Sequence, residues 1–216
     1  MDPTYWPFFG LRLATADLEL LPTTEDDVGP LAGLVPDDLE IDPRATRYPA
    51  IDDERVQRGI VVHQEYWRAY GTWRLESWRL QFTVWHGGER IGVQALEGDD
   101  FRELRTVDTF SWLVAEARGR GLGRQMRVAV LALAFGPMDA EAAITSAWHD
   151  NHPSLGVSRA LGYQPNGESR HAHGDRVDRM VHLRLVRADW LASGRGADVI
   201  IDGFDPCRPL LGLDTR

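Results

Sequence analysis

The stretch that most constrains the fold of this chain is Arg-Gly-Arg-Gly-Leu-Gly at residues 118–123. An apolar, strand-like run, Phe110 to Ala115, precedes it, and a helix-like run, Leu122 to Phe135, follows it. Glycines let the backbone turn tightly, and a helix start presents unpaired N–H groups at the positive end of its dipole. The pattern therefore predicts a strand–loop–helix unit whose loop can bind phosphate or pyrophosphate. A glycine-rich turn without a ligand is the alternative that this stretch alone leaves open.

Two common phosphate-binding motifs do not match this loop. A P-loop ends in Gly-Lys-Ser/Thr, whereas Gly123 is followed by Arg124. A dinucleotide fingerprint, G-x-G-x-x-G, that started at Gly119 would need a third glycine at position 124. The pattern that does fit is Arg-x-x-Gly-x-Gly, formed by Arg118, Gly121 and Gly123.

The composition restricts the classes of function. A chain of 216 residues favours a single domain, residues 1–216, with two small domains as the alternative. Hydrophobic residues make up 43% of the chain, which argues against disorder, and a net charge of -9 without a basic run argues against nucleic-acid binding. No apolar stretch is long enough for a membrane span, and the first ten residues do not read as a signal peptide. Cys207 is the only cysteine, so we expect no disulfide and predict a soluble, cytoplasmic protein.

Hydrophobic periodicity predicts an alternation of strands and helices. The expected elements are a strand at 18–21, a helix capped by Thr23 or Thr24, a helix from Asp52 or Asp53 to about Trp73, strands at 78–84 and 90–96 joined by a Gly87-Gly88 turn, a strand at 107–115, a buried helix at 122–135, a strand at 142–148, a helix ending at Leu161, a strand at 177–186, a short helix at 187–193 and a last strand at 198–202. This order predicts an α/β (α+β) fold, with a mixed sheet and helices on both of its faces.

Three further patterns bear on the surface of the molecule. In the helix that ends near Trp73, a stripe of largely apolar side chains recurs at helical spacing: Val56, Ile60, His63 and Trp67. Segments 36–49 and 98–105 are predicted to be loops, as is the polar stretch around His171 and His173. The aromatic N-terminus, Pro3 to Phe9, reads as exposed, and together with the apolar tail it suggests contacts in a homodimer or higher homo-oligomer.

Two motifs in this order resemble the GNAT acyltransferases, the Gcn5-related N-acetyltransferase superfamily. The loop resembles the family's coenzyme A pyrophosphate loop. The later segment Asn-His-Pro-Ser, residues 151–154, with Leu-Gly-Tyr at 161–163, resembles the branch that includes the ribosomal-protein N-terminal acetyltransferases. The resemblance covers about residues 18–186 and leaves 187–216 as a C-terminal extension. The tail, Val199 to Leu210, resembles an actinobacterial GNAT subgroup that includes succinyl-CoA-using members.

The resemblance implies a mostly antiparallel GNAT sheet and an acetyl-CoA or succinyl-CoA cosubstrate, without a metal. The strand before the loop would bind pantetheine and the loop would bind pyrophosphate. The positions implied for the cosubstrate are Leu113, Val114, Ala115, Arg118, Gly119, Arg120, Gly121, Leu122, Gly123, Arg124, Asn151 and Ser154. An amine of a small molecule, a lysine side chain or a protein N-terminus would be the acceptor.

The catalytic positions are less clear from the pattern. Many GNAT enzymes carry a general-acid tyrosine where this chain has Ser158, and the ribosomal-protein branch uses a serine that corresponds to Ser154. Ser154 can instead be an ordinary residue of the first helical turn. Asp108 is the first candidate for the general base, acting through water, and a solvent-exposed carboxylate at a strand end is the alternative. The departure at Ser158 leaves a non-catalytic acyl-CoA-binding sensor or interaction protein as the second hypothesis.

Four residues are expected at the acceptor and acyl side. Trp112, on the cosubstrate strand, is placed in the acceptor pocket. A succinyl carboxylate would need a cationic partner, and Arg44, Arg47 and Arg74 flank the region where GNAT acceptor pockets form. Ordinary surface charges are the alternative for each arginine. We do not predict a metal site at His149, Asp150 and His152, because metal sites need three or four converging ligands.

Overall fold

The computed structural model describes residues 2–39, 45–173 and 176–213. The described residues form one nine-stranded sheet in the order β7-β8-β6-β5-β4-β3-β2-β1-β9. The strands are β1 (Arg12–Ala14), β2 (Glu19–Pro22), β3 (Ser77–His86), β4 (Glu89–Asp99), β5 (Thr106–Leu113), β6 (Ala142–Trp148), β7 (Gln164–His173), β8 (Arg176–Val186) and β9 (Ile200–Asp202). Among these described strands, β5 and β6 form the only parallel pair. The predicted fold class, a mixed and mostly antiparallel sheet, is confirmed.

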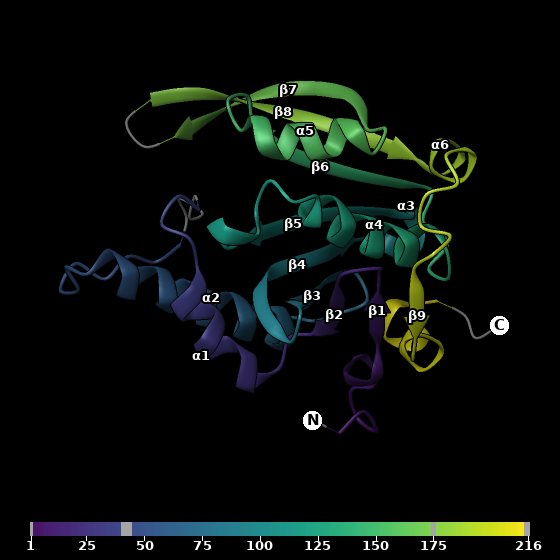
Figure 1. Ribbon diagram of the computed structural model, residues 1–216, viewed down its shortest axis with the longest axis horizontal. Coiled ribbons are helices and arrows are strands. Elements are labelled where there is room, and N and C mark those ends of the chain that lie inside the picture. Colours follow the sequence, from purple (N-terminus) through teal and green to yellow (C-terminus); the bar gives the residue numbers. More distant parts are fainter. Residues whose placement is uncertain (1, 40–44, 174–175, 214–216) are drawn as a thin grey trace.

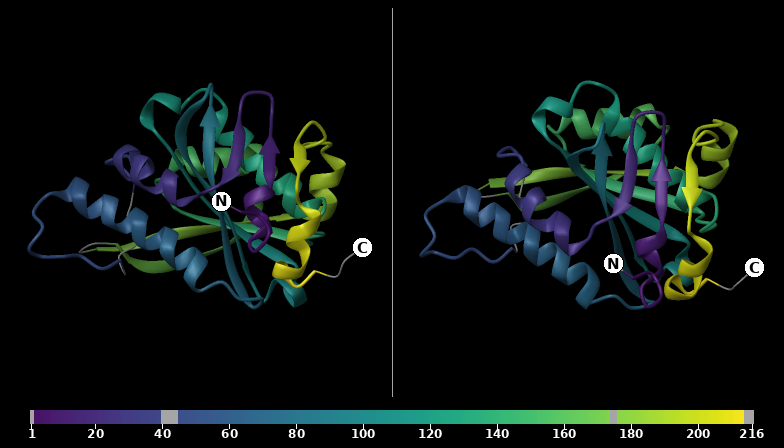
Figure 2. Two further views of the ribbon diagram at one scale, coloured as in Figure 1. Left: turned by 90° about the horizontal axis from the view of Figure 1, so that it is seen from below. Right: turned by 60° about the horizontal axis from the view of Figure 1, so that its bottom comes forward.

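Helices cover both faces of the sheet (Figures 1 and 2). The α-helices are α1 (Glu25–Leu34), α2 (Glu54–Gly71), α3 (Phe101–Leu104), α4 (Leu122–Phe135), α5 (His152–Ala160) and α6 (Arg187–Ala192). The 3-10 helices are η1 (Pro7–Gly10), η2 (Ala115–Ala117) and η3 (Asp205–Leu211). On β5, Leu113 packs into the large core with α4, whereas its neighbour Trp112 packs on Leu31 of α1. Since successive strand residues face opposite sides, α1 and α4 lie on opposite faces.

Local sequence signals explain where several of these elements begin. The capping box at α1 is formed by Thr24 and Asp27, and the Asp27 carboxylate accepts a hydrogen bond from the Thr24 N–H at 2.8 Å. Asp53 caps α2 by accepting from the N–H groups of its first turn. Gly87 and Gly88 join β3 to β4 with φ angles of 59° and 84°, which a two-residue hairpin turn of this kind requires. Helix α4 is buried nearly all round, as its sequence predicts.

The structure corrects the prediction for the face of α2. The helix forms, but Val56 and Trp67 of the apolar stripe are 47% and 55% exposed. The side chains that α2 buries are Gln57, Tyr66 and Ala69. Tyr66 and Tyr70 pack against one another, with ring centroids 5.0 Å apart. Tyr66 and Tyr70 therefore lie on the packing side of α2, whereas the stripe is exposed at its two ends and half-buried at Ile60 and His63.

Four predicted segments differ in the structure. Gln164–His173, expected as a loop around His171, is strand β7, because it pairs with β8 in a long hairpin. The connection 98–105 contains the end of β4 and helix α3. The N-terminal aromatics are not an exposed patch: Phe8 is 0% exposed and lies 4.8 Å from Trp73 between ring centroids. The tail is also packed on its own chain, with Cys207 and Leu211 both 0% exposed. Tyr5 and Ile200 stay exposed, at 87% and 55%, and oligomer contacts at these two places remain a prediction.

Among the described residues, no helix combines the length and the apolar character that crossing a membrane requires. The elements that matter for the site are central in the sheet. Strand β5 leads into the loop at 118–123, and β6 leads into α5. The only parallel contact in the described part of the sheet therefore brings the two sequence motifs to the same edge.

Candidate functional site

The site is organised by the way β5 and β6 separate. Their parallel pairing covers only Thr106 to Asp108 on β5 and Ala142 to Ile144 on β6. Beyond these pairs, β5 continues to Leu113 and β6 continues to Trp148 without strand pairing between them. We call the two unpaired segments, Thr109–Leu113 and Thr145–Trp148, the wedge (Figure 1). Backbone groups that face each other across the wedge are free to bind a ligand in extended conformation.

The glycine-rich loop lies at the open end of the wedge. Gly119 and Gly121 have φ angles of 71° and 81°, so the backbone turns through the left-handed region before α4 begins at Leu122. Among the described residues, no group accepts a hydrogen bond from the N–H of Gly119, Arg120 or Gly121. The first turn of α4 adds N–H groups without intrahelical partners. Free backbone N–H groups at the start of a helix are an arrangement that can bind an anion such as phosphate.

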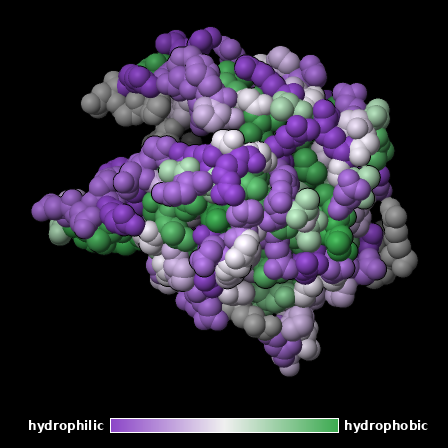
Figure 3. Space-filling model, viewed as in Figure 1, coloured by the Kyte–Doolittle hydropathy of each residue, from purple (hydrophilic) through white to green (hydrophobic). Residues whose placement is uncertain are grey.

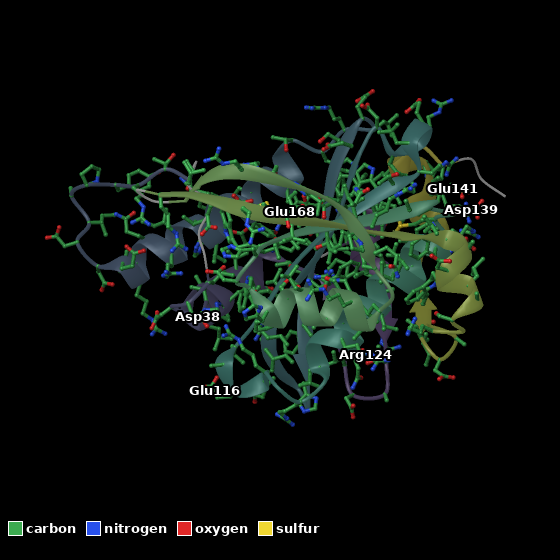
Figure 4. The ribbon with its side chains drawn as sticks, turned by 90° about the horizontal axis from the view of Figure 1, so that it is seen from above. Asp38, Glu116, Arg124, Asp139, Glu141 and Glu168 are labelled. Atoms are coloured by element: carbon green, nitrogen blue, oxygen red, sulfur yellow. The ribbon has the colours of Figure 1, made fainter. Side chains whose placement is uncertain are left out.

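The loop arginines have different environments. Arg118 donates from Nε to the Leu113 carbonyl at 3.0 Å and from Nη2 to Asp38 at 2.8 Å. The hydrogen bonds from Arg118 hold the pKa of the Asp38 carboxyl below its ordinary value. Arg120 lies 3.3 Å from Nε2 of His86, and Arg124 is exposed at the start of α4 (Figure 4). Arg118 therefore orders the loop, whereas Arg120 and Arg124 supply positive charge around it.

Helix α5 flanks the same loop. A side chain at Gly123 would lie 4.0 Å from Val157, so the start of α4 and the middle of α5 are in contact. Asn151 caps α5, and its Oδ1 accepts from the Ser154 N–H at 3.1 Å. Ser158, which is 1% exposed, donates its hydroxyl to the Ser154 carbonyl at 3.1 Å. The partly exposed Ser154 is thus better placed than Ser158 to donate a hydroxyl to a ligand.

Asp108 is the last paired residue before the wedge opens. Its Oδ1 accepts from the Thr109 N–H at 2.6 Å, and it sits opposite Glu97 on β4. Burial raises the pKa of Asp108 to about 6, and the negative charge of Glu97 acts in the same direction. The Thr109 hydrogen bond and the cations Arg127 and Arg79 oppose this rise. A carboxyl that titrates near neutrality at the base of the wedge can accept a proton there.

Sequence analysis missed a buried polar cluster on the α4 side of the wedge. Arg127 of α4 is only 4% exposed, and its Nη2 lies 3.3 Å from the Ser111 hydroxyl of β5. Its Nε and Nη1 have no hydrogen-bond partner among the described residues, and neither has the buried Tyr163 hydroxyl. The available signal was a single arginine within the otherwise apolar run 126–135.

The opposite side of β5 faces α1 and α2. Trp112 is 7% exposed and packs with Leu31 and Val93, next to the wedge. Farther along this side, His182 joins Ser146 at 2.8 Å and Ser169 at 2.6 Å, linking three strands through one imidazole. The surface is hollowed between the β7–β8 hairpin and the α2 region (Figure 3).

Two of the three predicted arginines lie in the described part of the chain, and each has another environment. Arg47 is exposed and pairs with Glu54 at 3.1 Å. Arg74 precedes β3, at the end of the sheet where β5 begins, which is the end away from the loop. Arg44 lies outside the described residues. Glu116 projects from the outer tip of the loop (Figure 4).

One group of potential metal ligands is present in the described part of the chain, formed by His149, Asp150 and Asp178. Its carboxylates already have a cationic partner, because Arg176 lies 2.9 Å from Asp178 and 3.7 Å from Asp150. His149 contacts Asp178 at 2.9 Å. An ion-pair network between β8 and the start of α5 accounts for this group.

Comparison with known families shows the family of the chain. The acetyltransferase (GNAT) domain matches residues 17–164, which include β2, the wedge, the loop and α5. The chain belongs to the GNAT acetyltransferase family. The match makes it an acetyltransferase, and members of this family use acetyl-CoA.

Solved GNAT structures share the fold at low sequence identity. RimJ of Mycobacterium smegmatis, in complex with CoA-disulfide, has a TM-score of 0.62 and 16% identity over 86% of this chain and 93% of its own. RimL, a ribosomal L7/L12 alpha-N-protein acetyltransferase in complex with coenzyme A, has a TM-score of 0.60 and 14% identity over 82% and 97%. Mutant forms of the spermidine/spermine N-acetyltransferase SpeG from Vibrio cholerae have a TM-score of 0.63 and 13% identity over 84% and 100%.

Proposed function

We propose that this GNAT enzyme transfers an acyl group from a CoA thioester directly to an amine. The observation that carries the proposal is the wedge with the glycine-rich loop at its open end. The loop N–H groups would bind the pyrophosphate, and the backbone of Leu113, Val114 and Ala115 would bind pantetheine. Acetyl-CoA is the common donor of the family, and succinyl-CoA is the second candidate because of the tail at 199–210.

Each step of the reaction has a candidate group. The amine nitrogen attacks the thioester carbonyl carbon, the C–S bond breaks, and the sulfur leaves as a thiolate. Asp108 would accept the amine proton through water. Ser154 would donate a hydrogen bond to the thiolate, since its hydroxyl is partly exposed on the helix that flanks the loop. Asn151 holds the first turn of α5 in place for this role.

The acceptor would approach from the side of Trp112. A small amine, a lysine side chain and a protein N-terminus are the acceptor classes, and the hollow beside α2 leaves this side open (Figure 3). RimL acts on a protein N-terminus and SpeG on spermidine or spermine, so the shared fold does not choose among the classes.

A second function is favoured by one observation. The position of the general-acid tyrosine is Ser158, whose hydroxyl is engaged by the Ser154 carbonyl. A non-catalytic sensor that binds acyl-CoA on the same scaffold would not need a general acid.

Release of free CoA thiol distinguishes the two functions, because only the enzyme breaks the thioester bond. Acetyl-CoA and succinyl-CoA are each incubated with a panel of small amines, a lysine peptide and an N-terminal peptide, while calorimetry measures CoA binding. Amine-dependent release of free thiol supports the enzyme. Tight CoA binding without release on any acceptor would support the sensor, and absence of CoA binding would exclude both.

A further inference from the structure

The buried polar cluster beside the wedge has no role in the reaction steps above. Arg127 projects from α4 toward β5, where Ser111 is its only hydrogen-bond partner among the described residues, at 3.3 Å. Two of its three nitrogens, Nε and Nη1, are buried without an acceptor. Leaving a buried guanidinium without partners is costly, because the water that solvated it has been removed.

Two further hydroxyls lie beside Arg127. Within the described part of the chain, the Tyr163 and Thr109 hydroxyls are both buried, and neither makes a hydrogen bond of good geometry. Burial raises the pKa of Tyr163, and the nearby charge of Arg127 opposes that rise. Weaker hydrogen-bond contacts with Arg127 and Thr109 also oppose the rise in the pKa of Tyr163, so the three side chains lie next to one another. Tyr163 therefore remains a protonated donor at neutral pH. With Ser111, the cluster presents a guanidinium and three hydroxyls, a set that can donate more hydrogen bonds than it can accept.

The cluster lies where the wedge begins. Thr109 is the first residue of β5 after the last pair with β6, and Ser111 follows two positions later on the same side of the strand. These two residues span ~7 Å of the wedge wall. Asp108 interacts electrostatically with Arg127, but its side chain alternates to the opposite side of β5. No carboxylate among the described residues is bonded to Arg127.

We propose that Arg127, assisted by Tyr163, binds the terminal carboxylate of a dicarboxylic acyl group carried by CoA. The inference rests on the proposed function, in which acyl-CoA lies in the wedge. A carboxylate accepts hydrogen bonds only, so it complements a site rich in donors. The bound carboxylate is negatively charged, so it can compensate the positive charge of the buried Arg127 guanidinium. An acetyl group is too short and carries no charge to pair with it.

The test measures binding, so that it does not depend on finding the acceptor. Calorimetry compares succinyl-CoA, acetyl-CoA and free CoA on the wild-type protein and three variants. Arg127→Met removes the charge at similar length, and Tyr163→Phe removes only the hydroxyl. Arg159→Met is the control, because Arg159 is an exposed arginine on α5. Circular dichroism checks folding, and replacing an unpaired buried charge by an apolar side chain is often neutral or stabilising.

We expect the wild type to bind succinyl-CoA more tightly than acetyl-CoA by about 10-fold or more, the effect of a charge-assisted hydrogen bond. Arg127→Met should abolish this preference and leave acetyl-CoA affinity unchanged. Tyr163→Phe should reduce it in part, and Arg159→Met should keep it. If the wild type binds the two donors with equal affinity, the inference is overturned and the proposed function stays intact. The same holds if Arg127→Met loses affinity for both donors to the same extent. Failure of all three ligands to bind would instead overturn the proposed function. If Arg127→Met does not fold, an unchanged preference in Tyr163→Phe overturns the role of the cluster.

Discussion

At the scale of single residues, the loop depends on backbone conformation more than on side chains. Gly121 has a φ of 81°, and a Cβ added there would meet no atom within 4 Å. A valine at this position would therefore be accommodated in space but strained in its backbone. The N–H groups that point toward the proposed pyrophosphate site would be redirected.

Gly121→Val is expected to weaken CoA binding at least about 10-fold to 100-fold, since hydrogen bonds to a charged group are lost, while the protein stays folded. Calorimetry with free CoA measures the effect. Gly167→Val is a matched control, because Gly167 on β7 also has a positive φ, 102°, and open space around it. Unchanged CoA affinity in a folded Gly121→Val protein would remove the loop from the site.

Asp108 gives a prediction for pH dependence. Because burial raises its pKa to about 6, Asp108 is protonated below that pH and accepts a proton only above it. The rate of acyl transfer should therefore rise as pH increases through about 6. Asp108→Asn should lower the rate about 100-fold, a typical loss for a general base. A pH–rate profile that is flat between about pH 5 and pH 8 in the wild type, measured with an amine of low pKa, would contradict this role.

The raised pKa of Asp108 also predicts that the stability of the fold decreases as pH rises, whereas the rate increases. The folded protein holds the Asp108 proton more tightly than the unfolded chain does, so ionisation destabilises the fold as pH rises from about 4 to about 6. Asp108→Asn removes that cost. We expect it to raise the free energy of unfolding by about 1–3 kcal/mol above about pH 6, with little effect near about pH 4. Urea denaturation at both pH values measures the difference, and equal effects at the two would contradict it.

At the scale of elements, substitutions in α5 test which group donates a hydrogen bond to the leaving thiolate. Ser154→Ala should lower kcat about 10-fold and leave the KM for acyl-CoA nearly unchanged, because the hydrogen bond forms mainly in the transition state. Ser158→Ala should be close to silent in catalysis, since its hydroxyl is committed to the helix backbone. If Ser158→Ala lowers kcat and Ser154→Ala does not, the role belongs to Ser158. If neither substitution changes kcat, water supplies the proton to the thiolate.

The sequence predicted elements well where the pattern was local. Helix α4 and strand β6 begin and end at the predicted residues, because buried apolar runs between glycines and prolines leave few alternatives. Strand β7 was missed because its stability comes from pairing with β8 and not from its own polar sequence. The α2 stripe was misjudged because periodicity shows a face but not which face packs. Arg127 stood out in the sequence only as one arginine in an apolar run, and its burial beside Tyr163 arises from tertiary packing.

At the scale of the whole molecule, the sheet consists of two antiparallel blocks. One contains β9 and β1 to β5, and the other contains β6, β8 and β7. Three residue pairs between β5 and β6 join the strands of the two blocks. Amide hydrogens of the wedge segments should therefore exchange faster than those of β3 and β4, and CoA should protect them. Hydrogen exchange followed by mass spectrometry, with and without CoA, measures this, and equal protection of the wedge in both states would contradict it.

The second block is continuous in the chain, from Ala142 to Val186, before β9 returns to the first. The two strands of the wedge, β5 and β6, thus belong to separate stretches of the chain, and each is paired with an antiparallel partner, β4 or β8. Among the strand pairings of the described residues, widening the wedge would break only these three pairs, but both blocks also pack into one hydrophobic core with α4. We therefore expect a longer acyl chain to be admitted only as far as repacking against α4 lets the two blocks separate.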